Sequence, residues 1–309
     1  KLAHGVLLTG AAGFLGRYIA RHFGAEGWRV VGVDDAPVES VPLRSGATYH
    51  RMRLPNPALG ELLAAERPQV CIHCAGRASV PQSMKDPAPD FRDNTALTFE
   101  LLNLLRQYVP GCRFLLLSSA AVYGNPRSLP VGEGDEVRPV SPYGFHKRQC
   151  ELLCQEFSSI YGVPTASVRI FSAYGAGLRR QIIWDICERL LMGSELVLHG
   201  SGMESRDFIH AVDVARALSL LARLAPCEGE VYNLATGREV STRELAALVT
   251  GVLKPEMAAR FDGRVRAGDP LHWRANIAKI SAIGFTPTIS LEQGIRTVAT
   301  WASAELAAR

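Results

Sequence analysis

Tyr143 and Lys147 stand four residues apart in the segment Ser-Pro-Tyr-Gly-Phe-His-Lys, and together they could move a proton. Residues at this spacing in a helix lie on one face, so the phenol and the ammonium would be neighbours. The ammonium favours the phenolate over the phenol, and a tyrosine that exchanges its proton readily can act as a general acid/base. The same spacing is also common in plain solvated pairs on helices, so the chemistry depends on what else the chain supplies.

Two serines, Ser118 and Ser119, follow the apolar run 115–117, which is typical of a buried strand. Open parallel sheets place their reactive groups at the carboxyl ends of the strands, so these hydroxyls could bind a substrate oxygen. Serines at a strand end also make turns. Beside a tyrosine/lysine pair, both serines become candidates to hydrogen-bond a substrate oxygen, and Ser118 is also a candidate for the cofactor site.

A glycine-rich segment at 9–16 follows the first apolar run and opens an amphipathic stretch. In a strand-turn-helix context such glycines permit a sharp turn, a close approach to a pyrophosphate and tight helix packing, whereas alone they make only a turn. The helix N-terminus would then face the phosphates with free N–H groups. We expect the following residues at the pyrophosphate: Gly10, Gly13, Phe14, Leu15 and Gly16.

Asp34 and Asp35 end the next apolar run, at the distance from the glycines where a dinucleotide site places its ribose-binding carboxylate. A carboxylate there accepts hydrogen bonds from the adenosine ribose and repels a 2′-phosphate, so NAD is predicted over NADP. Asp34 is the better candidate for the ribose, and Asp35 could cap the loop. Further candidates for lining the nicotinamide side are Ala75, Asn94 and His73, although His73 could equally be a buried core imidazole.

Apolar runs alternate with amphipathic stretches through the first half of the chain, which predicts βαβ units and a doubly wound parallel (Rossmann) α/β sheet. The predicted strands are 6–9, 29–33, 69–74, 113–118 and 165–170, and the predicted helices are 14–24, 59–66, 91–108 and 143–161. After residue 171 the pattern loosens, with helices expected at 182–192, 211–224 and 241–252 and a strand at 230–234. We therefore predict an NAD-binding domain at 1–170 and a smaller, mainly substrate-binding lobe at 171–309, from which segments at about 207–235 return to the first domain.

Composition narrows the possible partners. The 309 residues are 47% hydrophobic, and 34 basic residues are interspersed with 30 acidic ones, so we expect neither a nucleic-acid partner nor a membrane patch. The basic pair Arg179-Arg180 is either a solvated turn or an anion contact in a cleft. Seven cysteines and no apolar membrane span predict a reducing, cytoplasmic setting, and Cys71 and Cys74 are expected to be inert buried thiols rather than metal ligands.

With these motifs in place, the chain resembles the extended short-chain dehydrogenase/reductase family, in its nucleotide-sugar epimerase/dehydratase branch. The matching segments are T-G-A-A-G-F-L-G at 9–16, V-D-D at 33–35, H-C-A-G at 73–76, S-S-A-A-V-Y-G at 118–124, Y-G-F-H-K at 143–147, R-I-F-S-A-Y-G at 169–175, G-M-E-S-R-D-F-I-H-A-V-D at 202–213, Y-N-L-A-T-G at 232–237 and R-A-G-D-P at 266–270.

The resemblance implies that Ser119 assists Tyr143, that Lys147 holds the nicotinamide ribose, and that Arg206 and Arg266 hold the sugar-nucleotide diphosphate. Two guanidiniums suit a diphosphate, although each arginine could instead pair with an acidic neighbour in sequence. The remaining residues that the resemblance places near the substrate are Ser79, Ser172 and Asp269. No metal site is expected.

Positions at which this chain departs from the family pattern indicate which reaction of the branch it catalyses. Similar 4,6-dehydratases carry an acidic residue where this chain has Ala120 and Ala121, and methyl groups cannot transfer protons, so dehydration is disfavoured. Ser172 stands where many relatives have Asn, and Met52-Arg53-Leu54 stands where many have an acidic residue, which affects the expected sugar and adenine contacts.

The sequence therefore predicts an NAD-dependent nucleotide-sugar epimerase that acts at C4 through a transient 4-keto sugar. A nucleotide-sugar reductase or dehydrogenase with exchangeable cofactor is the alternative, and a non-catalytic dinucleotide-binding regulator is a third possibility. The apolar faces of 91–108 and 143–161 could form a homodimer seam, as the resemblance implies, or could simply pack in the core. Trp273 could limit the sugar pocket or cover the junction between the lobes.

Overall fold

The computed structural model describes residues 4–37, 47–264, 268 and 270–308. Its centre is a seven-stranded sheet in the spatial order β11-β6-β5-β4-β1-β2-β3, and every neighbouring pair is parallel. The strands are β1 (Gly5–Thr9), β2 (Arg29–Asp34), β3 (Thr48–Arg51), β4 (Val70–His73), β5 (Arg113–Ser119), β6 (Thr165–Ile170) and β11 (Glu228–Leu234). This order, with its reversal between β1 and β4, confirms the predicted doubly wound α/β fold.

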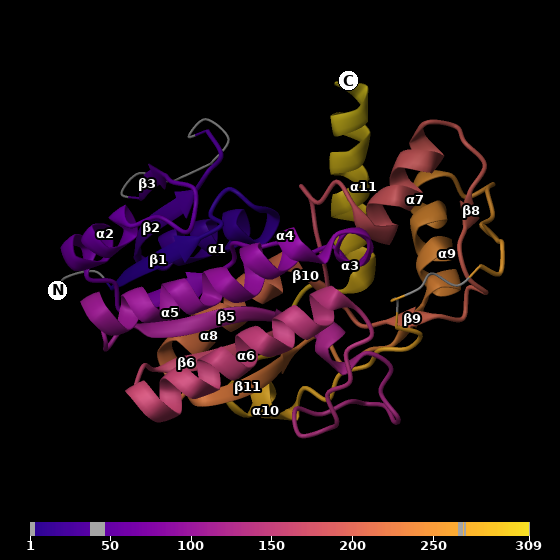
Figure 1. Cartoon of the computed structure of the whole chain (residues 1–309). Helices are drawn as coiled ribbons and strands as arrows, with labels where there is room; N and C mark the ends of the chain where they lie inside the picture. The colour runs from indigo at the N-terminus through magenta and orange to yellow at the C-terminus, as the bar shows by residue number, and fades with distance from the viewer. Residues whose placement is uncertain (1–3, 38–46, 265–267, 269, 309) are drawn as a thin grey trace.

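Alternating residues of the buried strands form two cores, one on each face of the sheet, beneath the helices that Figure 1 shows covering it. Val6 and Leu8 of β1 pack into one core, and Leu7 packs into the other, as the two-residue period of a strand requires. One face is covered by α1 (Phe14–Ala25) and α8 (Ala211–Leu224), and the other by α2 (Ala58–Glu66), α5 (Leu97–Tyr108) and α6 (Pro142–Tyr161). Because all seven strands run in parallel, their carboxyl ends lie at one edge of the sheet.

A separate apolar cluster lies at the other end of the molecule, where three helices pack on one another (Figure 1). These helices are α7 (Gln181–Leu191), α9 (Thr242–Leu253) and α11 (Leu291–Ala307). Three short strand pairs also lie in this part of the chain, namely β7 (Ser172–Tyr174) with β10 (Phe208–His210), β9 (Ser205–Arg206) with β12 (Val240–Ser241), and β8 (Val197–Leu198) with β13 (Arg260–Phe261). The predicted division into two domains remains a prediction.

The structure differs from the predicted elements in several places. The expected helix 91–108 is broken into α4 (Pro87–Phe91), the π-helical segment η2 (Arg92–Ala96) and α5, and α3 (Val80–Lys85) precedes it. Strand β3 was not predicted, because its residues are only partly buried and form no apolar run. Helix α11 was not predicted either.

The β11 edge of the sheet is occupied by polar contacts from other segments. Lys279, on the short helix α10 (Ala278–Ala282), donates a hydrogen bond of 2.7 Å to the Val231 carbonyl. Glu133 Oε1 accepts from the Asn233 N–H at 2.8 Å. These contacts satisfy backbone groups that an edge strand would otherwise present to solvent.

Within the described part of the chain, no helix is both long and apolar enough to cross a membrane.

Candidate active site

The turn between β1 and α1 forms a cradle that only small residues can build. Gly10 has φ +69°, and a Cβ there would lie 2.6 Å from the Ala75 nitrogen. A Cβ at Gly16 would lie 2.1 Å from the Gly10 carbonyl oxygen. Helix α1 begins after Gly13, which makes no side-chain cap, and its first turn holds no acidic residue. The N–H groups of Phe14 and of the residues after it therefore suit an anion.

Asp34 is fixed against this cradle by two backbone N–H groups. One carboxylate oxygen accepts from Ala12 at 3.0 Å, and the other accepts from Ala36 at 3.1 Å. Each oxygen keeps capacity for a further hydrogen bond, as a ribose diol requires. Asp35 is exposed and lies 3.6 Å from Arg53 Nη1, so its side chain points to a different partner.

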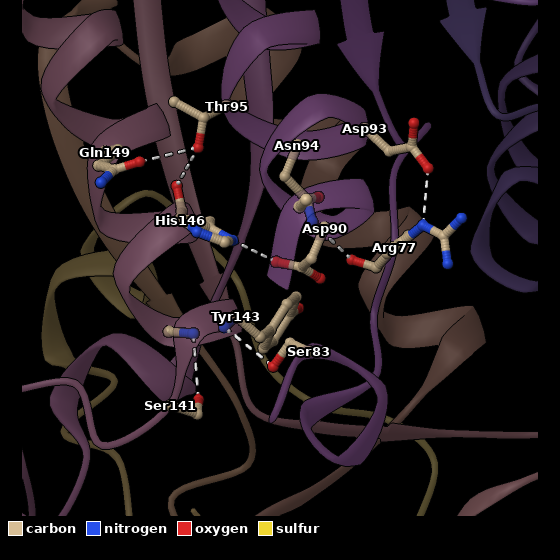
Figure 2. A network of polar contacts seen from close by, with 12 residues as sticks. Arg77, Ser83, Asp90, Asp93, Asn94, Thr95, Ser141, Tyr143, His146 and Gln149 are labelled. Atoms are coloured by element: carbon tan, nitrogen blue, oxygen red, sulfur yellow. Dashed lines mark hydrogen bonds and ion pairs between the residues drawn. The ribbon is translucent and has the colours of Figure 1, made fainter. Parts of the chain in front are cut away.

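The start of α6 positions the tyrosine. Ser141 caps the helix by accepting from the Gly144 N–H at 3.2 Å, and Pro142 follows in the first turn. The Tyr143 N–H donates to Ser83 Oγ on α3 at 3.1 Å, as Figure 2 shows, and only 8% of Tyr143 is exposed. Sequence reasoning did not identify Ser83, because nothing in the sequence places α3 beside α6.

Lys147 lies one turn further along α6 and is almost fully buried. Its Nζ donates to the Leu117 carbonyl of β5 at 3.0 Å and lies 5.9 Å from the Tyr143 ring centroid. Ser119 ends β5, and its Oγ accepts from the Ala121 N–H at 3.1 Å, which opens the 3₁₀ helix η3 (Ala120–Tyr123). The structure therefore brings Lys147, Tyr143 and the end of β5 together.

The two serines point to different partners, because successive residues of a strand face opposite sides. Ser118 donates to Glu151 Oε1 at 2.7 Å, inside a buried network. In that network Arg169 donates to both Glu151 oxygens and to the Tyr123 hydroxyl. The Ser118 hydroxyl is thus bonded within the fold, whereas Ser119 belongs to the turn above the strands.

His73 is a core imidazole. It is 2% exposed, and its Nδ1 lies 2.8 Å from the Thr9 hydroxyl. Burial, and secondarily the nearby Lys147 charge, lowers the pKa of His73 to about 3. The ring is therefore neutral beside the ammonium. The Ala75 N–H donates to the same Thr9 hydroxyl at 3.3 Å, so this contact shapes the loop that borders the cradle.

Asn94 lies in the π-helical segment η2, and such segments often occur at functional sites. Its Nδ2 donates to the Arg77 carbonyl at 3.2 Å, while its buried Oδ1 has no hydrogen-bond partner among the described residues (Figure 2). A Cβ at Gly76 would lie 2.5 Å from that oxygen. Asn94 Oδ1 is thus an orphaned acceptor beside the loop that follows β4, where a ligand donor could satisfy it.

Asp90 and His146 form a buried pair that sequence reasoning missed. His146 Nδ1 lies 2.5 Å from Asp90 Oδ2, across the contact between α4 and α6 (Figure 2). His146 is the residue between Phe145 and Lys147, so the pair helps to fix the helix face that carries the tyrosine and the lysine. The two residues are far apart in sequence, and no local pattern links them.

The predicted substrate residues lie on several elements. Ser79 caps α3 by accepting from the Gln82 N–H at 3.3 Å, and Ser172 begins β7. Arg206 ends β9 and donates to the Ser205 carbonyl at 2.8 Å. The next residue is Asp207, and its buried carboxylate accepts hydrogen bonds from residues 236, 237 and 275. Arg266 and Asp269 lie outside the described residues.

The basic pair of the loop before α7 divides between two contacts. Arg179 Nε donates to Glu305 Oε1 on α11 at 2.9 Å. Arg180 donates to the Ala78 carbonyl in the loop after β4. Arg180 therefore joins the C-terminal helices to the loop that borders the candidate site.

The cysteines supply no metal site. All seven are free. Cys71 is buried as expected, whereas Cys74 is only partly buried, and desolvation raises the pKa of both thiols. Among the described residues, no group of three or more His, Cys, Asp or Glu side chains could hold a metal ion.

Comparison with known proteins shows which family the chain resembles. Residues 6–235 match the NAD dependent epimerase/dehydratase family. A UDP-glucose 4-epimerase of Mycolicibacterium smegmatis is 29% identical over 305 residues, covering 94% of this chain and 95% of that protein.

Solved structures extend the likeness over nearly the whole chain. MoeE5 in complex with UDP-glucose and NAD is 31% identical, with a TM-score of 0.86 over 98% of this chain and 99% of that one. The UDP-glucuronic acid 4-epimerase of Bacillus cereus, in complex with UDP-glucuronic acid and NAD, is 26% identical, with a TM-score of 0.90 over 97% of this chain and 99% of that one.

Proposed function

The chain belongs to the NAD dependent epimerase/dehydratase family, and we propose that it is an NAD-dependent nucleotide-sugar epimerase that acts at C4 of a UDP-sugar. The observation that carries the proposal is the buried pair of Tyr143 and Lys147, in which Lys147 Nζ lies 5.9 Å from the Tyr143 ring centroid and donates to the Leu117 carbonyl of β5. Ala120 and Ala121, which are buried beside Tyr143, supply no second acid/base group for removing water. The UDP-sugar substrate class is supported by what MoeE5 and the Bacillus cereus enzyme bind.

The residues present fit NAD. The cradle at Gly10, the uncapped start of α1 and the fixed Asp34 carboxylate suit a pyrophosphate and a ribose. The orphaned Asn94 Oδ1 and the Ala75 loop would lie on the nicotinamide side, and Lys147 would hold the second ribose. When bound, NAD supplies reversible hydride exchange with C4, so the net redox change is zero.

Tyr143 would accept the proton of the C4 hydroxyl and return it once the 4-keto sugar has turned over in the site. Lys147 Nζ lies 5.9 Å from the Tyr143 ring centroid, so the ammonium stands beside the ring that carries out this step. Ser119 accepts from a backbone N–H and so keeps its own hydrogen to donate to the reacting oxygen.

Arg206, together with Arg266, would hold the diphosphate while the sugar turns, with Ser79, Ser172 and Asp269 at the sugar. Anchoring the part of the substrate that does not react lets its binding energy orient the part that does.

The test is to incubate the purified protein with UDP-glucose, UDP-glucuronic acid and UDP-N-acetylglucosamine, without added cofactor, and to follow interconversion by NMR. We expect one C4 epimer pair to equilibrate. Tyr143→Phe should lower turnover by roughly 100-fold or more while the protein keeps its NAD, because only the proton transfer is removed. Steady consumption of NADH with a 4-keto sugar would identify a reductase, and inertness toward all three sugars would favour a binding protein.

We also propose a homodimer built on α5 and α6. Phe145, Leu152 and Ile160 recur along one side of α6 and are 54%, 48% and 70% exposed. Phe99 on α5 is 42% exposed, so a row of apolar side chains is open on this face.

Leu152→Glu should convert the dimer to a monomer in analytical ultracentrifugation. Met192→Glu, which changes an equally apolar residue at the end of α7 that is 68% exposed, should leave the assembly unchanged. A monomeric wild-type protein, or equal effects of both variants, would overturn this interface.

A cytoplasmic location is proposed as well, because six of the seven free cysteines are buried and unpaired. Activity should therefore be unaffected by a thiol reductant.

A further inference from the structure

Trp273 lies between the candidate proton-transfer site and the candidate diphosphate anchor. It is 8% exposed and shares an apolar cluster with Ala121 and Tyr143. Its ring lies 6.0 Å from the Phe171 ring, at an interplanar angle of 71°. The indole is therefore held in the same apolar cluster as the candidate proton-transfer residue.

The backbone of Trp273 is fixed by β9. The Trp273 N–H donates to the Ser205 carbonyl at 3.2 Å, and the Ser205 N–H donates to the Leu271 carbonyl at 3.0 Å. The segment 271–273 thus runs beside the strand that ends in Arg206. The side chains of Trp273 and Arg206 consequently reach the same place from two adjacent segments.

The indole N–H binds the backbone at the end of η3, the 3₁₀ helix that follows Ser119. Trp273 Nε1 donates to the Gly124 carbonyl at 3.0 Å. Gly124 follows η3, the 3₁₀ helix that Ser119 opens, and it has φ +59°. A Cβ at Gly124 would lie 2.1 Å from the Arg138 carbonyl oxygen, so this acceptor is held in a tight backbone position.

The indole face supports the guanidinium. The Arg206 Cζ atom lies 5.1 Å from the ring centroid of Trp273, within the range of a cation–π contact. Arg206 Nη1 also donates to the carbonyls of Ser205 and Leu271, at 2.8 and 3.3 Å. The guanidinium plane is thus set by a stacked face and by two fixed acceptors.

We infer that Trp273 is a positioning residue, which orients Arg206 for the substrate diphosphate and ties that anchor to the turn of Ser119. This inference rests on the proposed function, because it takes Arg206 as the diphosphate contact. A guanidinium held in one orientation loses less side-chain entropy when it binds, so its orientation contributes to affinity for the nucleotide. Because the same indole is bonded to the Gly124 carbonyl, loss of the ring would also loosen the turn above β5.

The test is a double-mutant cycle on the NAD-loaded protein, with UDP as the probe in isothermal titration calorimetry. UDP carries the diphosphate without a sugar, so it reports the anchor separately from the sugar pocket. We expect Trp273→Leu to weaken UDP binding by roughly 3- to 30-fold. Trp273→Phe, which keeps a stacking face and loses the indole N–H, should weaken it less. In the Arg206→Ala background, Trp273→Leu should change the affinity by less than about twofold, because the residue through which it acts is gone.

Kinetics on the UDP-sugar supply a second readout, in which Trp273→Phe should raise KM more than it lowers kcat. Equal weakening of UDP binding by Trp273→Leu with and without Arg206 would overturn the inference, and so would unchanged UDP affinity in both Trp273 variants. If Arg206→Ala alone leaves UDP binding unchanged, the diphosphate anchor of the proposed function is wrong. If Arg206→Ala weakens binding while the Trp273 variants do not, only the positioning role fails. Trp273→Phe keeps the test decisive if Trp273→Leu does not fold.

Discussion

Removing the Glu151 carboxylate should destabilise the fold strongly, because it would leave a buried cation unpaired. Glu151 is fully buried and Arg169 is 2% exposed. Arg169 Nε and Nη2 donate to the two carboxylate oxygens at 2.9 and 2.8 Å. Burial opposes the charge of Arg169, but the hydrogen bonds and the charge of Glu151 outweigh it, so the pKa of Arg169 is raised. The guanidinium in Glu151→Ala would therefore stay charged without its main partner.

The expected magnitude follows from the burial of both groups. Removing one partner of a buried ion pair lowers the free energy of unfolding by about 3–5 kcal/mol. Unfolding entropy of about 2.1 cal/mol/K per residue, over 309 residues, gives roughly 0.65 kcal/mol per degree at the midpoint. Glu151→Ala should thus lower Tm by about 5–8 °C.

Arg148→Ala is the matched control. Arg148 binds the same carboxylate at 3.1 Å, but its side chain is 30% exposed. Losing a partly exposed partner should cost at most about 1 kcal/mol, which corresponds to a Tm shift of roughly 1.5 °C or less. Thermal unfolding followed by circular dichroism measures both variants. Similar shifts for the two would refute the reasoning, because they would show that burial does not decide the cost.

Two further predictions concern the dinucleotide side. The folded pKa of His73, about 3, lies below its unfolded value near 6.5, so the unfolded chain binds more protons between these values. The contribution of neutral His73 is complete above pH 6.5 and is lost as the pH falls toward 3; by pH 5 the loss is about 2 kcal/mol. Denaturant unfolding at pH 7 and 5 should show this extra loss in the wild type and not in His73→Asn, and parallel losses would contradict it. Asp34→Ser should shift cofactor selection toward NADP by at least about fivefold, since two like charges about 4 Å apart repel by roughly 1 kcal/mol even in water. Competition between the two cofactors during reconstitution measures the shift, and an unchanged preference would remove Asp34 from the ribose site.

The sheet could be predicted because its signals are local. Buried parallel strands are continuous apolar runs, and the glycines and serines at their carboxyl ends mark the edge where sites form. Those signals predicted β1, β2, β4, β5, β6 and β11, and they placed Tyr143 and Lys147 on one helix. Strand β3 has no such run and forms by pairing with β2, so its signal lies in its partner.

Contacts between distant segments could not be predicted in the same way. The break at η2 and the Asp90–His146 pair depend on how two helices meet, and Asp90 and His146 are separated by 56 positions. The bond from Tyr143 to Ser83 is of the same kind, with a separation of 60. Ser118 illustrates the limit for a site residue, because its type suggested a ligand contact while its partner, Glu151, is 33 positions away.

The ammonium of Lys279 on the outer margin of β11 also bears on how this protein can associate with itself. The Val231 carbonyl on this edge strand is already hydrogen-bonded, so it cannot pair with a strand from a neighbouring molecule. Growth of the sheet into fibrils at this edge is therefore disfavoured. Self-association through β11 is thereby disfavoured.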